Sequence, residues 1–150
     1  MRIMGLDFGA KTTGIAMSDL GCTLASPVET VFRQEEENLK QTVRRILQLA
    51  EENDVHTIVL GLPKNMNNTL GERAEKTLAF KRRLERDLYR VEILLWDERL
   101  STRMAEKPLL ERGLDRYHRK QVVDQIAAVY ILQGYLDARK AQEGNEESIR

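Results

Sequence analysis

The stretch RIMGLDFGAKTTGIAMSD, residues 2–19, decides the fold. Two apolar runs flank a short turn rich in glycine and threonine, and the first run ends in Asp7. A short turn of this composition between apolar runs is typical of an antiparallel hairpin. Residues 22–32 continue in strand-forming side chains, and Pro27 among them favours an edge strand or a break. The N-terminal part of the chain therefore predicts a three-stranded antiparallel meander.

The pattern changes after residue 36. Apolar side chains recur at spacings of three and four over 39–50 and again over 70–88, which predicts two amphipathic helices. Each is followed by a short apolar run, at 55–63 and at 90–98, which predicts a buried strand. Crossover helices imply parallel pairing of these two strands. We therefore predict an α/β domain: a five-stranded mixed sheet, three strands antiparallel and two parallel, with helices on both faces.

The last third of the chain predicts two more helices. One begins at Ser101, and Pro108 kinks or ends it. The other runs from about residue 121 to 139 and is apolar almost all round, so we expect it to be largely buried. We assign 1–138 to a single domain, and 139–150 to a polar C-terminal tail that frays.

Composition places limits on the function. The chain has 150 residues, of which 41% are hydrophobic and 32% charged, and this favours one globular domain with an ordinary core. Its single cysteine excludes an internal disulfide and a cysteine-based zinc site, and no apolar run is long enough to span a membrane. We therefore expect a cytoplasmic location. The 24 basic residues equal the 24 acidic ones, so only local clusters of charge favour nucleic acid.

Acidic residues stand at the ends of three elements predicted to be buried. Asp7 closes the first strand, Asp97 and Glu98 close the last strand, and Asp124 lies in the first turn of the final helix. Each alone has an ordinary explanation, because strand ends often meet water and an acid suits a helix N-terminus. Together they suit Mg²⁺, which takes oxygen ligands, and a pair of such ions serves in-line displacement at phosphorus.

Four motifs resemble the YqgF family of RuvC-like, Holliday-junction-resolvase-like nucleases, and together they span about residues 2–137. They are GLDFGAKTTGIAMSD (5–19), IVLGLPKNMNNTLGERA (58–74), LLWDERLSTRMAE (94–106) and DQIAAVYILQGYLD (124–137). The resemblance implies an RNase H-like fold and a nuclease that uses Mg²⁺ or Mn²⁺ and acts on structured nucleic acid. It also implies a role in 5′-end maturation of pre-16S rRNA during ribosome biogenesis.

The resemblance assigns catalytic and metal-binding roles to three acids. They are Asp7, Glu98 and Asp124. The neighbouring Asp97 stays an alternative to Glu98, because adjacent residues of a strand point to opposite faces and the pattern does not say which face carries the site. Asp97 would otherwise pair with Arg99 or cap the Ser101 helix.

Several residues near these acids are candidates for nucleic-acid binding. The turn after Asp7 and the GLPKN loop offer backbone amides and cations to a phosphate, and the segment before the last helix is locally basic. The candidates are Lys11, Thr12, Lys64, Asn65, Arg99, Arg103 and Lys120. The competing explanation is an ordinary hairpin turn and a solvated surface of mixed charge. We expect structured RNA as the partner, with branched DNA as a further substrate, and a monomer or homodimer.

Three other functions compete with the rRNA nuclease. The first is a Holliday-junction resolvase that cuts DNA. The second is an ATP-binding module, because GLDFGAKTTG also resembles the first phosphate loop of Hsp70-type and sugar-kinase-type ATPases; these need two such domains, whereas 150 residues hold one. The third is a non-catalytic RNA-binding factor for ribosome assembly. The distant acidic motifs favour the nuclease.

Overall fold

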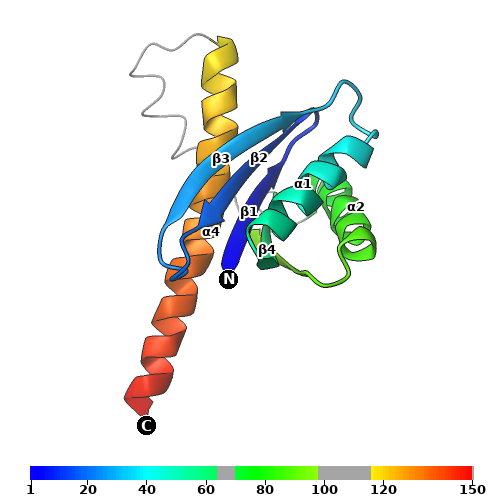
Figure 1. The fold of residues 1–150 in the computed structure, drawn as a ribbon. Coiled ribbons are helices and arrows are strands. Elements are labelled where there is room, and N and C mark those ends of the chain that lie inside the picture. The colour runs from blue at the N-terminus through cyan, green and yellow to red at the C-terminus, as the bar shows by residue number, and fades with distance from the viewer. Residues whose placement is uncertain (64–69, 98–115, 150) are drawn as a thin grey trace.

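The computed structural model describes residues 1–63, 70–97 and 116–149, and the side chains of the last range only over 125–143. Figure 1 shows how the elements are arranged. The strands are β1 (Arg2–Phe8), β2 (Thr12–Ser18), β3 (Ala25–Phe32), β4 (Val55–Leu62) and β5 (Glu92–Asp97). The helices are α1 (Lys40–Glu52), α2 (Glu72–Asp87) and α4 (Arg116–Ile149).

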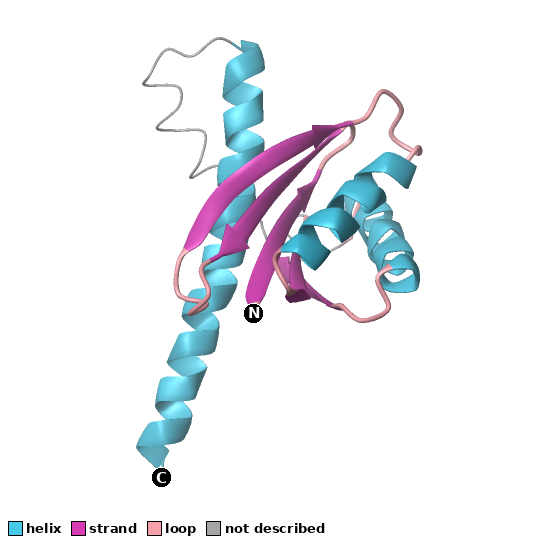
Figure 2. Cartoon of the chain, viewed as in Figure 1, coloured by secondary structure: helices cyan, strands magenta, loops and turns pink. Residues whose placement is uncertain are grey.

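The five strands form one mixed sheet in the order β3-β2-β1-β4-β5. The β1–β2 and β2–β3 pairs are antiparallel, whereas β1–β4 and β4–β5 are parallel. Helices α1 and α2 lie on one side of the sheet and α4 lies on the other (Figure 2). The predicted α/β class, the strand directions and the helices on both faces are therefore confirmed.

Strand β3 is an edge strand of this sheet, as Pro27 predicted. Ile15 of β2 pairs with Glu29, but the next residue of β2, Ala16, pairs with Pro27, so the register shifts between them and Val28 is extra. A bulge of this kind accommodates a residue that has no backbone N–H to give to the ladder.

The central strand β1 sends alternate side chains into two separate cores. Met4, Leu6 and Phe8 pack with α1 and α2 in one hydrophobic cluster. Ile3 belongs to the other cluster, which contains Leu132 and other apolar residues of α4. Because strand side chains alternate between faces, Gly5 and Asp7 share the α4 side with Ile3. The even-numbered residues of β1 from Met4 to Phe8 therefore face α1 and α2, and the odd-numbered ones from Ile3 to Asp7 face α4.

Strand β1 and helix α4 approach each other closely at Gly5. A Cβ placed on Gly5 would lie 2.7 Å from the Leu132 Cβ and 2.9 Å from the Ala128 carbonyl oxygen. Only a residue without a side chain fits between this strand and this helix. Helix α4 also contacts the start of β3 through polar groups: Gln133 accepts a hydrogen bond from the Ala25 amide and donates one to the Thr23 carbonyl, both at 2.9 Å.

Helix α4 is longer at both ends than the helix predicted over 121–139. The helix continues through the segment predicted to be a polar tail, whose residues are mostly good helix formers, such as Ala, Arg, Lys, Gln and Glu. Arg139 and Glu143 also form an i, i+4 ion pair of 3.4 Å there. The helix predicted from Ser101 lies outside the described residues. The domain boundary at 138 stays a prediction.

Among the residues that the structure describes, no helix combines the length and the apolar character needed to cross a membrane.

Gly5→Ala tests the close approach of β1 and α4. The added methyl group must displace helix backbone as well as a side chain, so we expect the free energy of unfolding to fall by about 1–3 kcal/mol, as for other overpacked cores. Urea denaturation measures this change. Gly21→Ala is the matched control, because its Cβ would meet only the Thr23 hydroxyl, at 3.6 Å. Equal stability of the two variants would contradict the close approach.

Candidate active site

The three parallel strands of the sheet end at the same edge, where Asp7 of β1 and Asp97 of β5 lie on strands that flank β4. Leu6 of β1 pairs with Leu60 of β4, and Leu62 at the end of β4 pairs with Asp97 at the end of β5. Asp7 follows Leu6 directly. The carboxyl ends of parallel strands are where open α/β sheets bind ligands.

Asp7 lies on the α4 face of this edge and is half-buried. Its pairing partner across β1 and β2 is Gly14, which in turn pairs with Thr30 of β3. Paired residues of antiparallel strands share a face. Asp7, Gly14 and Thr30 therefore form a row across the sheet on its α4 side. Sequence reasoning missed Thr30, because no local pattern specifies which residue of a third strand joins the row.

Position 124 of α4 lies close to the same row. Gly5 packs against Ala128, and Asp7 is two residues further along β1, about 6.7 Å toward the carboxyl edge. Helix α4 runs in the opposite direction to β1 (Figure 1), so the preceding turn of α4 lies toward that edge. One turn back from Ala128 is residue 124, about 6 Å along the helix axis. The backbone thus brings positions 7 and 124 to one end of the sheet.

The faces of β5 differ for its last two residues. Trp96 faces α4: its ring meets Tyr135 edge-on at 6.2 Å between centroids, and a Cβ on Gly134 would lie 3.1 Å from the indole nitrogen. Ile93 belongs to the opposite core, with α1 and α2. Asp97 follows Trp96 and is exposed, so alternation places it on the α1 and α2 side, away from the face of Asp7.

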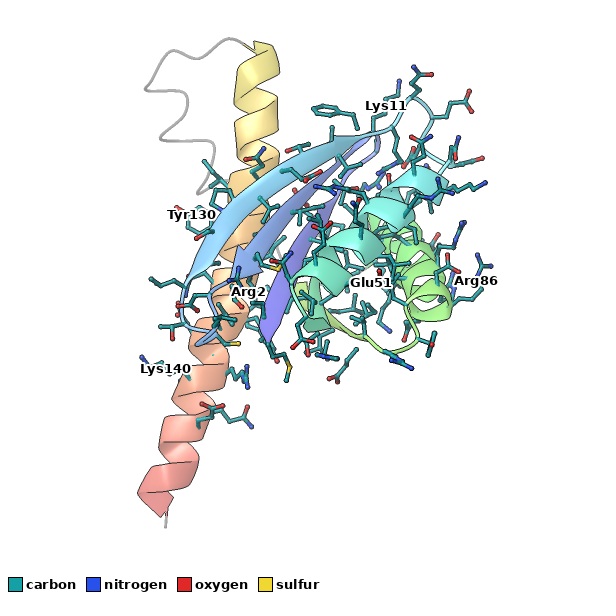
Figure 3. The ribbon with its side chains drawn as sticks, in the orientation of Figure 1. Arg2, Lys11, Glu51, Arg86, Tyr130 and Lys140 are labelled. Atoms are coloured by element: carbon teal, nitrogen blue, oxygen red, sulfur yellow. The ribbon has the colours of Figure 1, made fainter. Side chains whose placement is uncertain are left out.

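The turn between β1 and β2 is held by its own backbone and by the residue after β3. The Gly9 amide donates to the Thr12 carbonyl at 2.7 Å, and the Arg33 amide donates to the Lys11 carbonyl at 2.7 Å. Lys11 is exposed at the carboxyl end of β1 (Figure 3), whereas Thr12 is only 7% exposed. Of the two candidates in this turn, Lys11 is the one open to solvent.

Arg33 was not among the residues predicted from the sequence. Its guanidinium is buried beneath the β1–β2 turn and donates to the Thr13 hydroxyl at 2.8 Å and to the carbonyls of Gly9 and Ala10. Burial lowers the pKa of this guanidinium, and the charge of Arg73 acts in the same direction. No sequence signal marks it, because its partners are mostly backbone groups.

Glu36 ties the same region to α2. Its carboxylate accepts hydrogen bonds from Arg73 and from Lys76, the latter at 3.1 Å. The hydrogen bond from Arg73, followed by that from Lys76, holds the pKa of the Glu36 carboxyl below its ordinary value.

The remaining predicted residues cannot be placed beside these. Lys64, Asn65, Glu98, Arg99 and Arg103 lie outside the described residues. Asp124 and Lys120 belong to α4, but their side chains are not described. Among the side chains that are described, no group of three or more His, Cys, Asp or Glu residues could hold a metal ion. The structure therefore describes one side chain of the predicted acidic set, Asp7, and the backbone of a second.

The fold of the chain is shared with Holliday-junction resolvases. Thermus thermophilus RuvC matches with a TM-score of 0.55 at 16% identity, over 94% of this chain and 97% of that one. The Holliday junction resolvase of fowlpox virus matches with a TM-score of 0.53 at 15% identity, over 92% of this chain and 99% of that one. Together with the sheet order, these likenesses define an RNase H-like fold of the RuvC type.

Sequence comparison gives the family. A protein of Agathobacter rectalis named "Putative pre-16S rRNA nuclease" is 52% identical over 137 residues, 91% of this chain and 95% of that protein. One of Staphylococcus saprophyticus with the same name is 48% identical over 91% of this chain and 96% of that protein. The model of the RuvX family, described as Holliday junction resolvase, matches residues 1–138. The chain belongs to the RuvX family of RuvC-like nucleases.

Glu36→Gln tests the acid dependence of the α2 contact. Because folding lowers the pKa of this carboxyl, the unfolded chain binds more protons in acid. The stabilisation is therefore complete above the ordinary carboxyl pKa and is lost as the pH falls through the folded value. We expect Glu36→Gln to lose less stability than the parent between about pH 7 and pH 3, measured by urea midpoints. Glu37→Gln, which alters an exposed carboxylate of the same loop, is the control and should follow the parent.

Proposed function

We propose that the chain is a divalent-cation-dependent endonuclease that hydrolyses phosphodiester bonds in structured RNA. Its proposed role is processing of the 5′ end of pre-16S rRNA in the cytoplasm. Pre-16S rRNA is supported as the substrate by the names of two relatives, which are 52% and 48% identical to this chain over 91% of its length. The observation that carries the chemistry is the position of Asp7, a carboxylate at the carboxyl edge of the central strand and on the face that α4 covers.

The acidic set is proposed to assemble on that face. The backbone of α4 brings position 124 to the same end of the sheet as Asp7, so two acidic residues from elements far apart in the sequence lie at that end. Half-buried carboxylates near one another repel and are costly unless a cation or protons neutralise them. This placement supports a cation site and makes a purely structural role for the acids less favourable.

The third ligand is proposed to be Glu98 and not Asp97. Trp96 contacts α4, so a residue two positions later returns to the α4 face if the alternation of β5 continues. Asp97 falls on the opposite face. The structure of β5 therefore supports the choice that the sequence left open, although Glu98 itself lies outside the described residues.

Asp7, Glu98 and Asp124 are proposed to hold Mg²⁺ or Mn²⁺. Three carboxylates suit such hard cations, which take oxygen ligands and leave positions for water and a substrate phosphate. A bound cation would supply electrostatic stabilisation of the phosphoryl group and a lower pKa for the attacking water. The protein's part is to hold the carboxylates in place and to orient the phosphate.

The nucleic-acid contacts are proposed to surround this edge. Lys11 and Thr12 are the members of the set whose side chains the structure describes, and Lys11 is the exposed one, at the same end of the sheet (Figure 3). The other proposed contacts are Lys64, Asn65, Arg99, Arg103 and Lys120. Cations placed around a cleavage site hold the phosphate backbone and make affinity depend on salt. The expected monomer or homodimer stays a prediction.

Branched DNA is the second candidate substrate. The matching family model is described as Holliday junction resolvase, and RuvC of Thermus thermophilus, with a TM-score of 0.54, was solved with a Holliday junction substrate. That likeness is at 18% identity and concerns the fold alone. We therefore prefer pre-16S rRNA, which the names of the more similar relatives give, over branched DNA as the substrate.

The function is tested by cleavage of two purified substrates in Mn²⁺ or Mg²⁺: an RNA that spans the 5′ end of 16S rRNA with its leader, and a four-way DNA junction. We expect site-specific cleavage of the RNA and none in EDTA. Asp7→Asn, Glu98→Gln and Asp124→Asn should each lower the rate about 100-fold or more, because each removes a negative ligand worth several kcal/mol in the transition state.

Asp97→Asn is the matched control. It removes one negative charge next to Glu98 in the sequence, but Asp97 lies on the face of β5 opposite to that of Asp7. We expect it to cut within about threefold of the parent, which corresponds to a change of about 0.65 kcal/mol or less in barrier height. Parental cleavage by Asp7→Asn would refute the site. Faster cleavage of the junction than of the RNA would replace the first candidate substrate with the second.

A further inference from the structure

We propose that Arg33 is a positioning residue that fixes the β1–β2 turn from beneath, so that Lys11 and the backbone amides beside it are presented to a phosphate of the nucleic acid. The part played by Lys11 rests on the proposed function. The part played by Arg33 rests on its own contacts, which lie on the side of the sheet opposite to Asp7.

Arg33 contacts the turn on both sides of Lys11. Its guanidinium donates to the carbonyls of Gly9 and Ala10, the latter at 3.0 Å, and to the Thr13 hydroxyl at 2.8 Å. Its backbone amide donates to the Lys11 carbonyl at 2.7 Å. One residue therefore binds four of the five residues from Gly9 to Thr13, which form the turn and the start of β2, and it does so from the chain segment that follows β3.

These contacts orient the free edge of the turn. In a planar trans peptide the C=O and the next N–H point in opposite directions, and the described chain has no cis peptide bond. Since the Gly9 and Ala10 carbonyls point to the guanidinium, the amides of Ala10 and Lys11 point away from it. Both residues are exposed. Successive amides that point the same way form an anion-binding concavity, and the Lys11 ammonium adds a full charge beside them.

The guanidinium is itself held by the core. Arg33 is 7% exposed, and its guanidinium lies over the Phe8 ring, 4.6 Å from the centroid. Phe8 in turn stacks on Phe80 at 4.1 Å with an interplanar angle of 8°. A fork of donors with fixed geometry, packed against stacked rings, has little freedom to move. Arg33 thus connects an exposed turn to the packed core, and this connection restricts the motion of the turn.

Stability alone does not account well for this burial. The guanidinium hydrogen-bonds to carbonyls and a hydroxyl, and its Nε has no hydrogen-bond partner among the described groups. Burying a charge with only such partners costs free energy, and an apolar side chain of similar volume commonly gives a core equal or greater stability. What the guanidinium provides and an apolar side chain does not is a fixed direction for two carbonyls.

The test is a double-mutant cycle with Arg33→Met and Lys11→Ala, read out as affinity for the 16S-precursor RNA in EDTA, where no cleavage occurs. We expect each single variant to bind about tenfold more weakly and to lower the slope of log affinity against log salt by about one. The double variant should bind no more weakly than Lys11→Ala, because both changes remove the same contact. Additive losses, or parental affinity of Arg33→Met, would overturn the proposal.

Arg45→Met is the matched control, because Arg45 also ties β3 to a helix, through Glu29 at 2.6 Å, but does not touch the turn. It should keep parental affinity and salt slope. Amide hydrogen exchange gives a readout that needs no RNA: Arg33→Met should speed exchange at Gly9 and at residue 33, with β4 unchanged. If exchange speeds up at these amides but the parent chain binds no RNA, the proposed function fails and the positioning role of Arg33 stands. Unchanged exchange in Arg33→Met would refute the positioning role.

Discussion

The contact between Gly5 and the Ala128–Leu132 turn of α4 fixes how closely the central strand and the longest helix approach. With no side chain at Gly5, helix backbone lies against strand backbone. The next residue of β1 on the same face is Asp7, so the carboxylate begins where this tight packing ends. A larger residue at position 5 would separate the two elements that bring positions 7 and 124 together. The packing of the α4 face is therefore a requirement of the proposed site.

Phe8, which follows Asp7 in β1, anchors the same part of the strand on the α1 and α2 face. Phe8 stacks on Phe80 of α2 and supports the Arg33 guanidinium. Because Asp7 and Phe8 are adjacent, a ring locked in one core restricts the backbone from which the carboxylate projects. Arg73 also lies over this ring, at 5.2 Å, and is paired with Glu36. The edge of the sheet is thus held from the α1 and α2 side while the proposed chemistry takes place on the α4 side.

Local patterns predicted the elements and their directions, because alternation, helical spacing and crossover rules depend on neighbours in the sequence. They did not predict which face was which. Trp96 and Asp97 alternate in any strand, but only the packing of Trp96 on Tyr135 shows that its face is that of Asp7. Arg33 was missed for a related reason: most of its partners are backbone carbonyls, those of Gly9 and Ala10 being 24 and 23 residues away, and such acceptors occur at every position of every sequence.

Zero net charge does not oppose nucleic-acid binding in this fold, because internal pairing uses many of the charges. Arg45 pairs with Glu29, Arg73 with Glu36, and Arg83 with Asp87. All three pairs involve α1 or α2, on the side away from Asp7. Lys11 forms no ion pair with another described residue, and it is exposed at the carboxyl edge. A phosphate approaching that edge meets a cation that no described residue neutralises, even though the chain as a whole is balanced, since at physiological salt charges beyond about 8 Å are largely screened.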